Sequence, residues 1–152
     1  MIGLRMPLAL VALLASAAAA GPAETVSADA SPVETRQRLM VSMIRATKVP
    51  RAMVRGDRDF DAEAIDAAMT QVIEAGRQMP DLFADPGAAG PTATLPAAWD
   101  NPAEFTAAFA TLEREALGLA DAARQGPEAM ALAYQRYEAV CDGCHMRYRK
   151  DE

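Results

Sequence analysis

The chain has 152 residues, of which two are cysteine and one is histidine, and its formal net charge is −6 at pH 7. This length suits a single domain with a real hydrophobic core. The negative charge argues against a nucleic-acid-binding protein, which needs a basic surface, and against adhesion to anionic lipid. It favours encounter with basic partner surfaces, although the same charge can serve solubility alone.

The first 20 residues have the pattern of a secretory signal peptide. Arg5 provides a positive start, residues 7–14 an apolar stretch, and residues 18–20 a cleavage site of three alanines. The apolar stretch is too short for a stable membrane span, and an uncleaved anchor is the alternative interpretation. Removing residues 1–20 would leave 132 residues with a net charge of −7. The pattern predicts export to the bacterial periplasm, with no membrane span in the mature chain.

The mature chain is expected to begin with a flexible tail, residues 21–30, followed by one domain, residues 31–152. The tail is small, polar and contains proline. Ser31-Pro32-Val33-Glu34 then has the pattern of a capping box with proline in the first turn, which predicts the start of a helix. Pro50 should bend or end this helix, and Gly56 should stop whatever follows.

A second helix is predicted from Asp59 or Asp61, because apolar residues recur at helical spacing after these positions. Pro80 should terminate it. Residues 80–101 are rich in proline and glycine and should form a long irregular connection. A connection of this length in a compact domain is usually functional or mobile.

A capping pattern recurs at Asn101-Pro102-Ala103-Glu104 and predicts the start of a third helix. Gly126-Pro127 should end that helix and begin a fourth, which runs toward the C-terminus. No segment shows the alternation that is typical of strands. We therefore expect an all-α protein, an antiparallel four-helix bundle with one long and two short connections.

Both cysteines and the only histidine fall in the segment Cys-Asp-Gly-Cys-His, residues 141–145. C-x-x-C-H is the attachment sequence of a c-type haem. On a helix, Cys141, Cys144 and His145 share one face, so two thiols can anchor a porphyrin edge while the imidazole approaches the iron. The segment predicts one covalently attached haem c near the C-terminal end of the fourth helix, with His145 as the proximal axial ligand.

Three other interpretations of this segment remain open. A redox dithiol of thioredoxin type belongs in a strand–helix context, and no strand pattern precedes these residues. A structural zinc site needs four nitrogen or sulfur ligands, so the three present here would require a partner chain. A simple disulfide would leave the histidine unexplained.

The bundle geometry indicates where a second axial ligand could come from. In an up-down-up-down arrangement the fourth helix ends where the first begins. At ~1.5 Å per residue, Met40 lies about 14 Å into the first helix and His145 about 10 Å before the chain end, so both fall in one layer. Met43 and Met79 also lie within this layer. Methionine commonly fills apolar cores, so packing beside a five-coordinate iron is the alternative role for each of them.

The C-terminal sequence CDGCHMRYRK, residues 141–150, resembles the class II cytochromes c, the cytochrome c-prime family. So do TRQRLM, residues 35–40, and LPAAWDN, residues 95–101. The resemblance covers most of residues 31–150 and implies a four-helix bundle with one haem. Leu39-Met40 resembles the low-spin cytochrome c-556 branch, in which methionine completes the coordination, whereas five-coordinate members carry a non-ligating residue there. The resemblance thus implies Met40 as the distal axial ligand.

The resemblance also implies roles for residues around the haem. Arg36 would pair with a haem propionate and Arg149 would flank the proximal side, although each could instead be a solvated surface charge. Trp99, Phe105 and Phe109 would wall the haem, although aromatic core packing explains them as well.

Two functions are consistent with these patterns. Methionine–histidine ligation raises the haem potential and leaves no open site, which suits an electron carrier that meets donor and acceptor proteins and is not an enzyme. A five-coordinate iron would instead make a cytochrome c-prime that binds NO or CO, with Met40 only lining the distal pocket. A third interpretation keeps the thiols free as a dithiol or metal module. Class II relatives are often dimers, so a homodimer is a further expectation.

Overall fold

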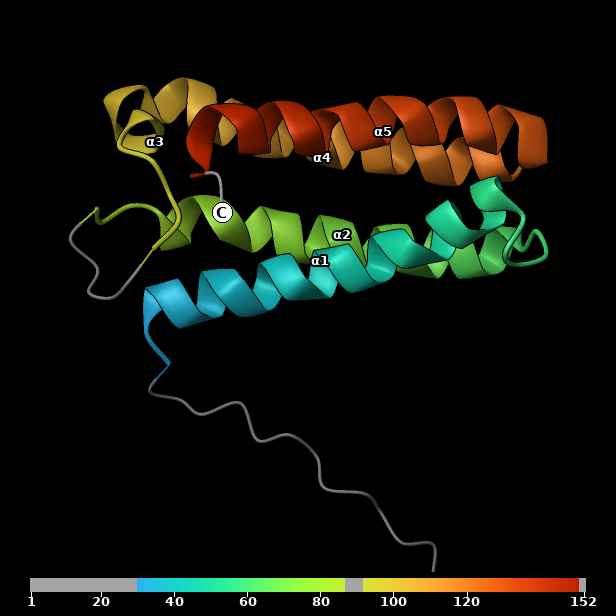
Figure 1. Cartoon of the computed structure of the whole chain (residues 1–152), viewed down its shortest axis with the longest axis horizontal. Coiled ribbons are helices and arrows are strands. Elements are labelled where there is room, and N and C mark those ends of the chain that lie inside the picture. The colour runs from blue at the N-terminus through green and yellow to red at the C-terminus, as the bar shows by residue number, and fades with distance from the viewer. Residues whose placement is uncertain (1–29, 87–91, 151–152) are drawn as a thin grey trace, which may run out of the picture.

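The computed structural model of the chain describes residues 30–86 and 92–150. The predicted signal peptide and all but the last residue of the predicted tail lie outside these ranges. The described residues form an antiparallel bundle of four long helices and one short helix (Figure 1), which confirms the predicted fold. The helices are α1 (Pro32–Arg55), α2 (Ala62–Leu82), α3 (Ala97–Asp100), α4 (Pro102–Ala123) and α5 (Pro127–Tyr148).

Helix α1 begins and ends where its sequence predicts. The Ser31 side chain accepts a hydrogen bond from the Glu34 N–H at 3.2 Å, and the Glu34 carboxylate accepts one from the Ser31 N–H at 2.8 Å, which completes the capping box. Gly56 closes the helix with φ of 78°, a conformation that glycine adopts without a steric penalty. Pro50 does not end the helix, and the last turns are inclined to the rest in Figure 1. Proline therefore bends α1.

Helix α2 starts after Asp61, whose carboxylate caps the Ala64 N–H at 3.0 Å. The predicted stop at Pro80 is wrong, because the helix continues to Leu82. Pro80 removes the hydrogen bond to the Gly76 carbonyl, but its fixed φ is helical and only the last turn lies beyond it. The helix ends when the Phe83 N–H turns to the Pro80 carbonyl at 3.1 Å.

The long connection between α2 and α4 contains the short helix α3, which the sequence interpretation did not include. Its preceding segment is attached to the end of α5: the Leu95 N–H donates to the Tyr148 carbonyl and the Lys150 N–H donates to the Ala93 carbonyl, both at 2.8 Å. Thr94 and Arg149 form an antiparallel bridge between these hydrogen bonds. The connection is thus attached to the end of α5, one turn beyond Cys144.

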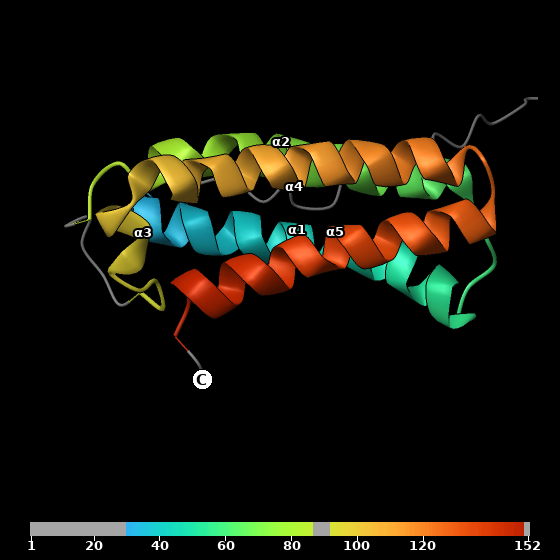
Figure 2. The ribbon, with the colours of Figure 1, turned by 90° about the horizontal axis from the view of Figure 1, so that it is seen from above.

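The four long helices are not packed equally tightly. The pairs α1–α2, α2–α4 and α4–α5 share extensive contacts, whereas α1 and α5 touch much less. Figure 2 places α1 and α5 on one side of the bundle, opposite α2 and α4, and Figure 1 shows them diverging toward the C-terminal end of α5. The core therefore follows the α1–α2, α2–α4 and α4–α5 interfaces, and the α1–α5 interface contributes least to it. Within the described ranges, no helix combines the length and the apolar character that crossing a membrane would require.

Leu119 offers a direct test of this core, because its side chain is fully buried whereas Leu132 on α5 is 61% exposed. Replacing Leu119 by alanine should lower the free energy of unfolding by about 2–5 kcal/mol, since a cavity is left behind. The matched change Leu132→Ala should alter it by less than about 0.5 kcal/mol. Urea unfolding of the two variants, followed by circular dichroism, measures the difference in free energy of unfolding. Equal urea midpoints would contradict the placement of Leu119 in the core.

Candidate cofactor-binding site

Helices α1 and α5 are joined at one end of their interface and separated at the other. The Thr47 hydroxyl lies 2.8 Å from that of Tyr137, and Arg51 donates to the Tyr134 hydroxyl at 3.0 Å and to the Glu138 carboxylate at 2.8 Å. These hydrogen bonds hold the helices together at the end where α5 begins. Toward the end where α5 finishes, no such bond between the two helices is found in the described residues, and cavities lie between them instead.

Two adjoining cavities, of about 350 and 290 Å³, lie between α1 and α5. The first extends toward the end of α2 and the segment before α3, and the second toward the hydrogen bonds that join α1 to α5. Together they make one elongated space between the two helices. The residues that line both are Met40, Ile44, Phe109, Cys144, His145 and Arg149.

The attachment segment lies on the last turns of α5 and faces this space. Cys144 and His145 line both cavities, and Cys141 lines the second. Cys141 and Cys144 are free thiols and not a disulfide, so a structural disulfide does not explain the segment. Cys141 Sγ lies 3.7 Å from the Tyr137 carbonyl oxygen, which orients it along the helix. The structure therefore brings together the three residues that the sequence predicts to bind haem.

Burial controls the protonation of this segment. It raises the pKa of the Cys141 thiol to about 11, with the nearby Asp142 and Cys144 adding to the effect, and it also raises the pKa of Cys144. Burial and the positive charge of Arg149 lower the pKa of His145. Near neutral pH the thiols are protonated and the imidazole is neutral, the form in which histidine binds metals.

These shifts disfavour the interpretation as a redox dithiol, because reactive dithiols have a lowered cysteine pKa. A separate metal site is not supported either. Among the described residues, no three histidine, cysteine or acidic side chains are placed so that they could hold a metal ion. The attachment of a haem remains the interpretation that uses all three side chains.

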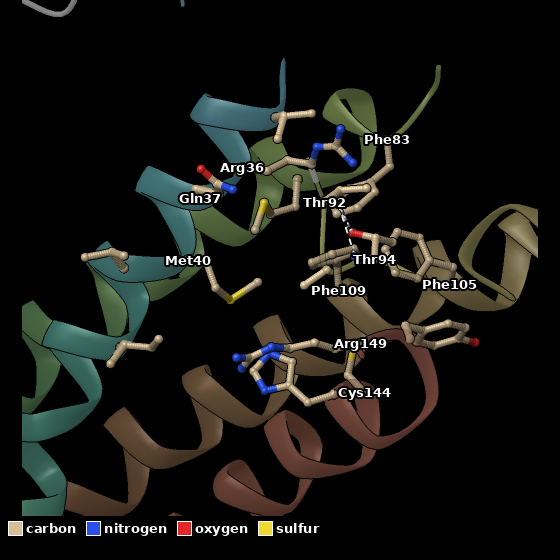
Figure 3. A pocket seen from close by; sticks show the side chains of 17 residues that line it. Arg36, Gln37, Met40, Phe83, Thr92, Thr94, Phe105, Phe109, Cys144 and Arg149 are labelled. Carbon is tan, nitrogen blue, oxygen red and sulfur yellow. Dashed lines mark hydrogen bonds between the residues drawn. The ribbon is translucent and has the colours of Figure 1, made fainter. Parts of the chain in front are cut away.

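Met40 lies on α1 opposite this segment. In Figure 3 its side chain projects from α1 toward the side of the space where Cys144 and Arg149 lie. It lines both cavities, as His145 does. Met43 and Met79, the other two candidates, each line only one cavity and are buried in the core. Of the three candidate methionines, Met40 is thus the one that lines both cavities together with His145.

Arg36 provides the clearest sign that a negatively charged group fits this space. Its side chain lines the first cavity and the residue is only 6% exposed. The guanidinium lies 4.4 Å from the centre of the Phe83 ring, and Nε donates to the Pro32 carbonyl at 3.4 Å. Its Nη1 is buried without a hydrogen-bond partner in the described structure. A buried, unsatisfied cation is costly, and a carboxylate in the cavity would satisfy it.

The aromatic residues divide into those that line the space and one that supports it. Phe105 and Phe109, which are predicted to wall the haem, line the first cavity, and their rings meet edge to face with centroids 5.3 Å apart. Phe83, which the sequence prediction did not place at the site, also lines this cavity. Trp99 lines neither cavity. Its indole N–H instead donates to the Phe83 carbonyl at 2.9 Å, so it holds Phe83 in position.

Several lining residues could not be identified from the sequence. Val41 and Ile44 line the first cavity and are 45% and 48% exposed, unusually open for aliphatic side chains in the middle of a bundle helix. An apolar group between α1 and α5 would cover them. Their only sequence signal was their place on α1 near Met40. Taken with Arg36, the space has an apolar wall, a buried cation and two thiols, and these features fit a haem c.

Comparisons with known proteins agree with this chemistry. A family model described as Cytochrome C' matches residues 31–149. A cytochrome c-556 of Agrobacterium tumefaciens is 30% identical over 120 residues, which cover 79% of this chain and 98% of that protein. The structure of a cytochrome c prime from Shewanella frigidimarina is similar with a TM-score of 0.72 and 25% identity, covering 79% of this chain and 94% of that one.

A carbon monoxide-bound variant of a cytochrome c prime from Alcaligenes xylosoxidans is similar with a TM-score of 0.69, 25% identity and the same coverage of the two chains, 79% and 94%. The match to the family covers α1 to α5 completely. Both the helical arrangement and the site segments therefore lie inside it. The chain belongs to the cytochrome c′ family and is a monohaem c-type cytochrome.

Proposed function

We propose that this protein is an electron carrier of the bacterial periplasm. Cys141 and Cys144 would hold the haem covalently, and His145 and Met40 would supply its iron ligands. The observation that carries this proposal is that Met40 and His145, from helices at opposite ends of the sequence, line the same two cavities. A bound haem c supplies reversible one-electron chemistry at its iron.

Each residue of the site has a role that suits electron transfer and not catalysis. His145 is neutral near pH 7 and can donate its nitrogen lone pair, because burial lowers its pKa. Met40, as a second iron ligand, would exclude a substrate. Phe105 and Phe109 would provide apolar contacts to the haem, and Arg36 would neutralise a haem carboxylate. If His145 and Met40 both ligate the iron, no position stays open for a substrate, and the protein is not expected to be an enzyme.

The similarity to cytochrome c-556 supports this assignment. A cytochrome c-556 matches over nearly its whole length, and the Leu39-Met40 pair resembles the methionine-ligated branch of the family. The signal-peptide pattern of residues 1–20 supports export. Donor and acceptor proteins of the periplasm would then be the partners.

Gas binding is the alternative function. A variant of a similar cytochrome c prime has carbon monoxide bound in its structure, and the space here has an apolar wall that includes Ile44 and Phe109. On this alternative Met40 would line the cavity without touching iron, and the distal side would accept NO or CO.

Optical spectra of the holo-protein, matured in a periplasm that attaches haem, distinguish the two functions. Sharp α and β bands after reduction, a weak long-wavelength charge-transfer band after oxidation and no change with CO are expected for the electron carrier. A broad high-spin spectrum that shifts on adding CO would reject it in favour of gas binding.

Replacing Arg36 by glutamine tests the role of the buried cation. Removing a positive charge near the haem stabilises the oxidised form, so the midpoint potential should fall by about 30–60 mV, which corresponds to roughly 0.7–1.4 kcal/mol for one electron. The matched change Arg38→Gln removes an exposed charge two residues away and should shift the potential by less than about 10 mV, because solvent screens that charge. Equal shifts in the two variants, measured by redox titration, would place Arg36 outside the haem environment.

A further inference from the structure

The charges of this protein are distributed very unevenly among its helices. Helix α1 carries six lysine and arginine residues and one acidic residue, a net charge of +5, although the whole chain has a net charge of −6. Helices α2 and α4 each carry four acidic residues and one arginine, a net charge of −3. The helix that carries Met40 is therefore strongly basic within an acidic protein.

Part of this charge forms an exposed strip on α1, which we call the basic strip and define as Arg38, Arg45 and Lys48. The three side chains are exposed, and none of them has an ion-pair partner among residues 30–86 and 92–150. Their spacing of seven and three residues places them on one face of the helix. The exposed apolar residues Val41 and Ile44 lie between them on the same side.

One member of the basic strip borders the site, whereas Arg38 and Arg45 line neither cavity. Lys48 lines the second cavity, Val41 lines the first and Ile44 lines both. Electron transfer slows steeply with distance, so a partner has to approach where the cofactor site reaches the surface. The surface next to the site on α1 combines an apolar centre with unpaired positive charges, the composition of a docking face that steers its partner electrostatically.

We propose that the protein docks its redox partner through the basic strip, and that the partner presents an acidic surface. The inference rests on the proposed electron-transfer function. At physiological salt, charges act over about 8 Å, so acidic side chains far from the site are largely screened. Glu138 and Asp142 line the second cavity, but Glu138 is paired with Arg51, and the three cations of the basic strip exceed the remaining charge of Asp142. Of the six cations on α1, Arg36 is buried and Arg51 is paired with Glu138, so only the basic strip is set against the haem: its three exposed charges exceed the two negative charges of the propionates. The distribution of charge thus favours an acidic partner, not the basic one that the net charge alone suggests.

The test is the salt dependence of electron transfer from the reduced holo-protein to two small oxidants, measured by stopped flow. The probes are ferricyanide, an anion, and tris(phenanthroline)cobalt(III), a cation. The inference predicts that the rate with ferricyanide falls as ionic strength rises and that the rate with the cobalt complex increases. If the net charge of the whole protein governed encounter, the rate with ferricyanide would increase with ionic strength and the rate with the cobalt complex would fall. That result would overturn the inference.

Variants with equal changes in net charge locate the effect. The double variant Arg45→Glu, Lys48→Glu should slow electron transfer to ferricyanide at low salt by about tenfold or more. It should also reverse the salt dependence of that rate. The control, Arg114→Glu with Arg136→Glu, changes the net charge equally at exposed residues that line neither cavity. This control should leave the sign of the salt dependence with ferricyanide unchanged. A reversal in both variants would show that no local docking surface exists.

Two further outcomes distinguish a failure of the docking surface from a failure of the electron-transfer function. If the holo-protein exchanged electrons with neither oxidant, the electron-carrier proposal would fail and this inference with it. If both oxidants reacted but the salt dependence of their rates had the signs expected from the net charge, only the docking inference would fail.

A lipid surface is the remaining class of anionic partner. Co-sedimentation with phosphatidylglycerol vesicles that depended on Arg45 and Lys48 would identify the strip as a lipid-binding surface and overturn the assignment of an acidic protein partner. No sedimentation is expected, because the acidic helices α2 and α4 would be repelled by an extended anionic membrane.

Discussion

Replacing both Cys141 and Cys144 by serine is expected to abolish covalent attachment of haem. The two thiols are the only cysteines in the chain, and both face the space between α1 and α5. A hydroxyl of nearly the same size cannot form the thioether bonds, so haem should be removed completely by acid–acetone extraction. Extraction of the purified variant, followed by in-gel haem staining, measures this loss.

The single variants serve as controls for folding. Cys141→Ser and Cys144→Ser should each keep one thioether and retain haem after extraction, with a reduced α band shifted from that of the parent protein because one vinyl group remains. Circular dichroism should show similar helix content in the haem-loaded single variants. Haem that still resisted extraction in the double variant would contradict attachment through this segment.

Much of the fold could be predicted because its signals are local. Ser31 and Asp61 cap helices with their own side chains, and Gly56 ends α1 in a left-handed conformation, so the neighbouring sequence is sufficient to mark these boundaries. Asn101 shows the limit of such patterns. Helix α4 starts directly after it, as predicted, but its side chain makes no capping hydrogen bond. Proline at the first position is enough to start the helix.

Features that depend on distant parts of the chain were not predictable in the same way. Helix α2 passes Pro80 and places Phe83 at the site, where Trp99 holds it by a hydrogen bond across the connection. The short helix α3 depends on the attachment of its preceding segment to the end of α5. No local pattern of apolar residues encodes these tertiary contacts. The sequence therefore predicts Trp99 as a lining residue, whereas Phe83 lines the cavity.

The site itself was predictable to different degrees. Cys141, Cys144 and His145 form a motif whose chemistry is specific at the level of sequence, and the structure adds only where they face. The position of Met40 followed from helix rise and bundle topology together. The burial of Arg36 and the separation of α1 from α5 could not be inferred from a helical pattern, because both depend on how the helices diverge in space.

Replacing Met40 by leucine is expected to convert a six-coordinate, low-spin iron into a five-coordinate, high-spin one. Leucine keeps nearly the same volume and apolar character but lacks the sulfur atom, so packing between α1 and α5 is preserved while the ligand is lost. The long-wavelength charge-transfer band of the oxidised protein should disappear, and the reduced protein should bind CO. The midpoint potential should fall on the order of 0.1 V, within the ~0.8 V range that axial ligands span.

The matched control is Met43→Leu, one turn further along α1. Met43 is buried and lines only the second cavity, so its replacement should leave the spectra of both oxidation states and the CO response unchanged. If Met40→Leu also left both spectra unchanged, Met40 would not be the distal ligand. A parent protein that already bound CO would then act as a gas-binding member of its family, with Met40 as part of an apolar pocket wall. The two variants therefore distinguish the two functions by testing whether the sulfur atom of Met40 ligates the iron.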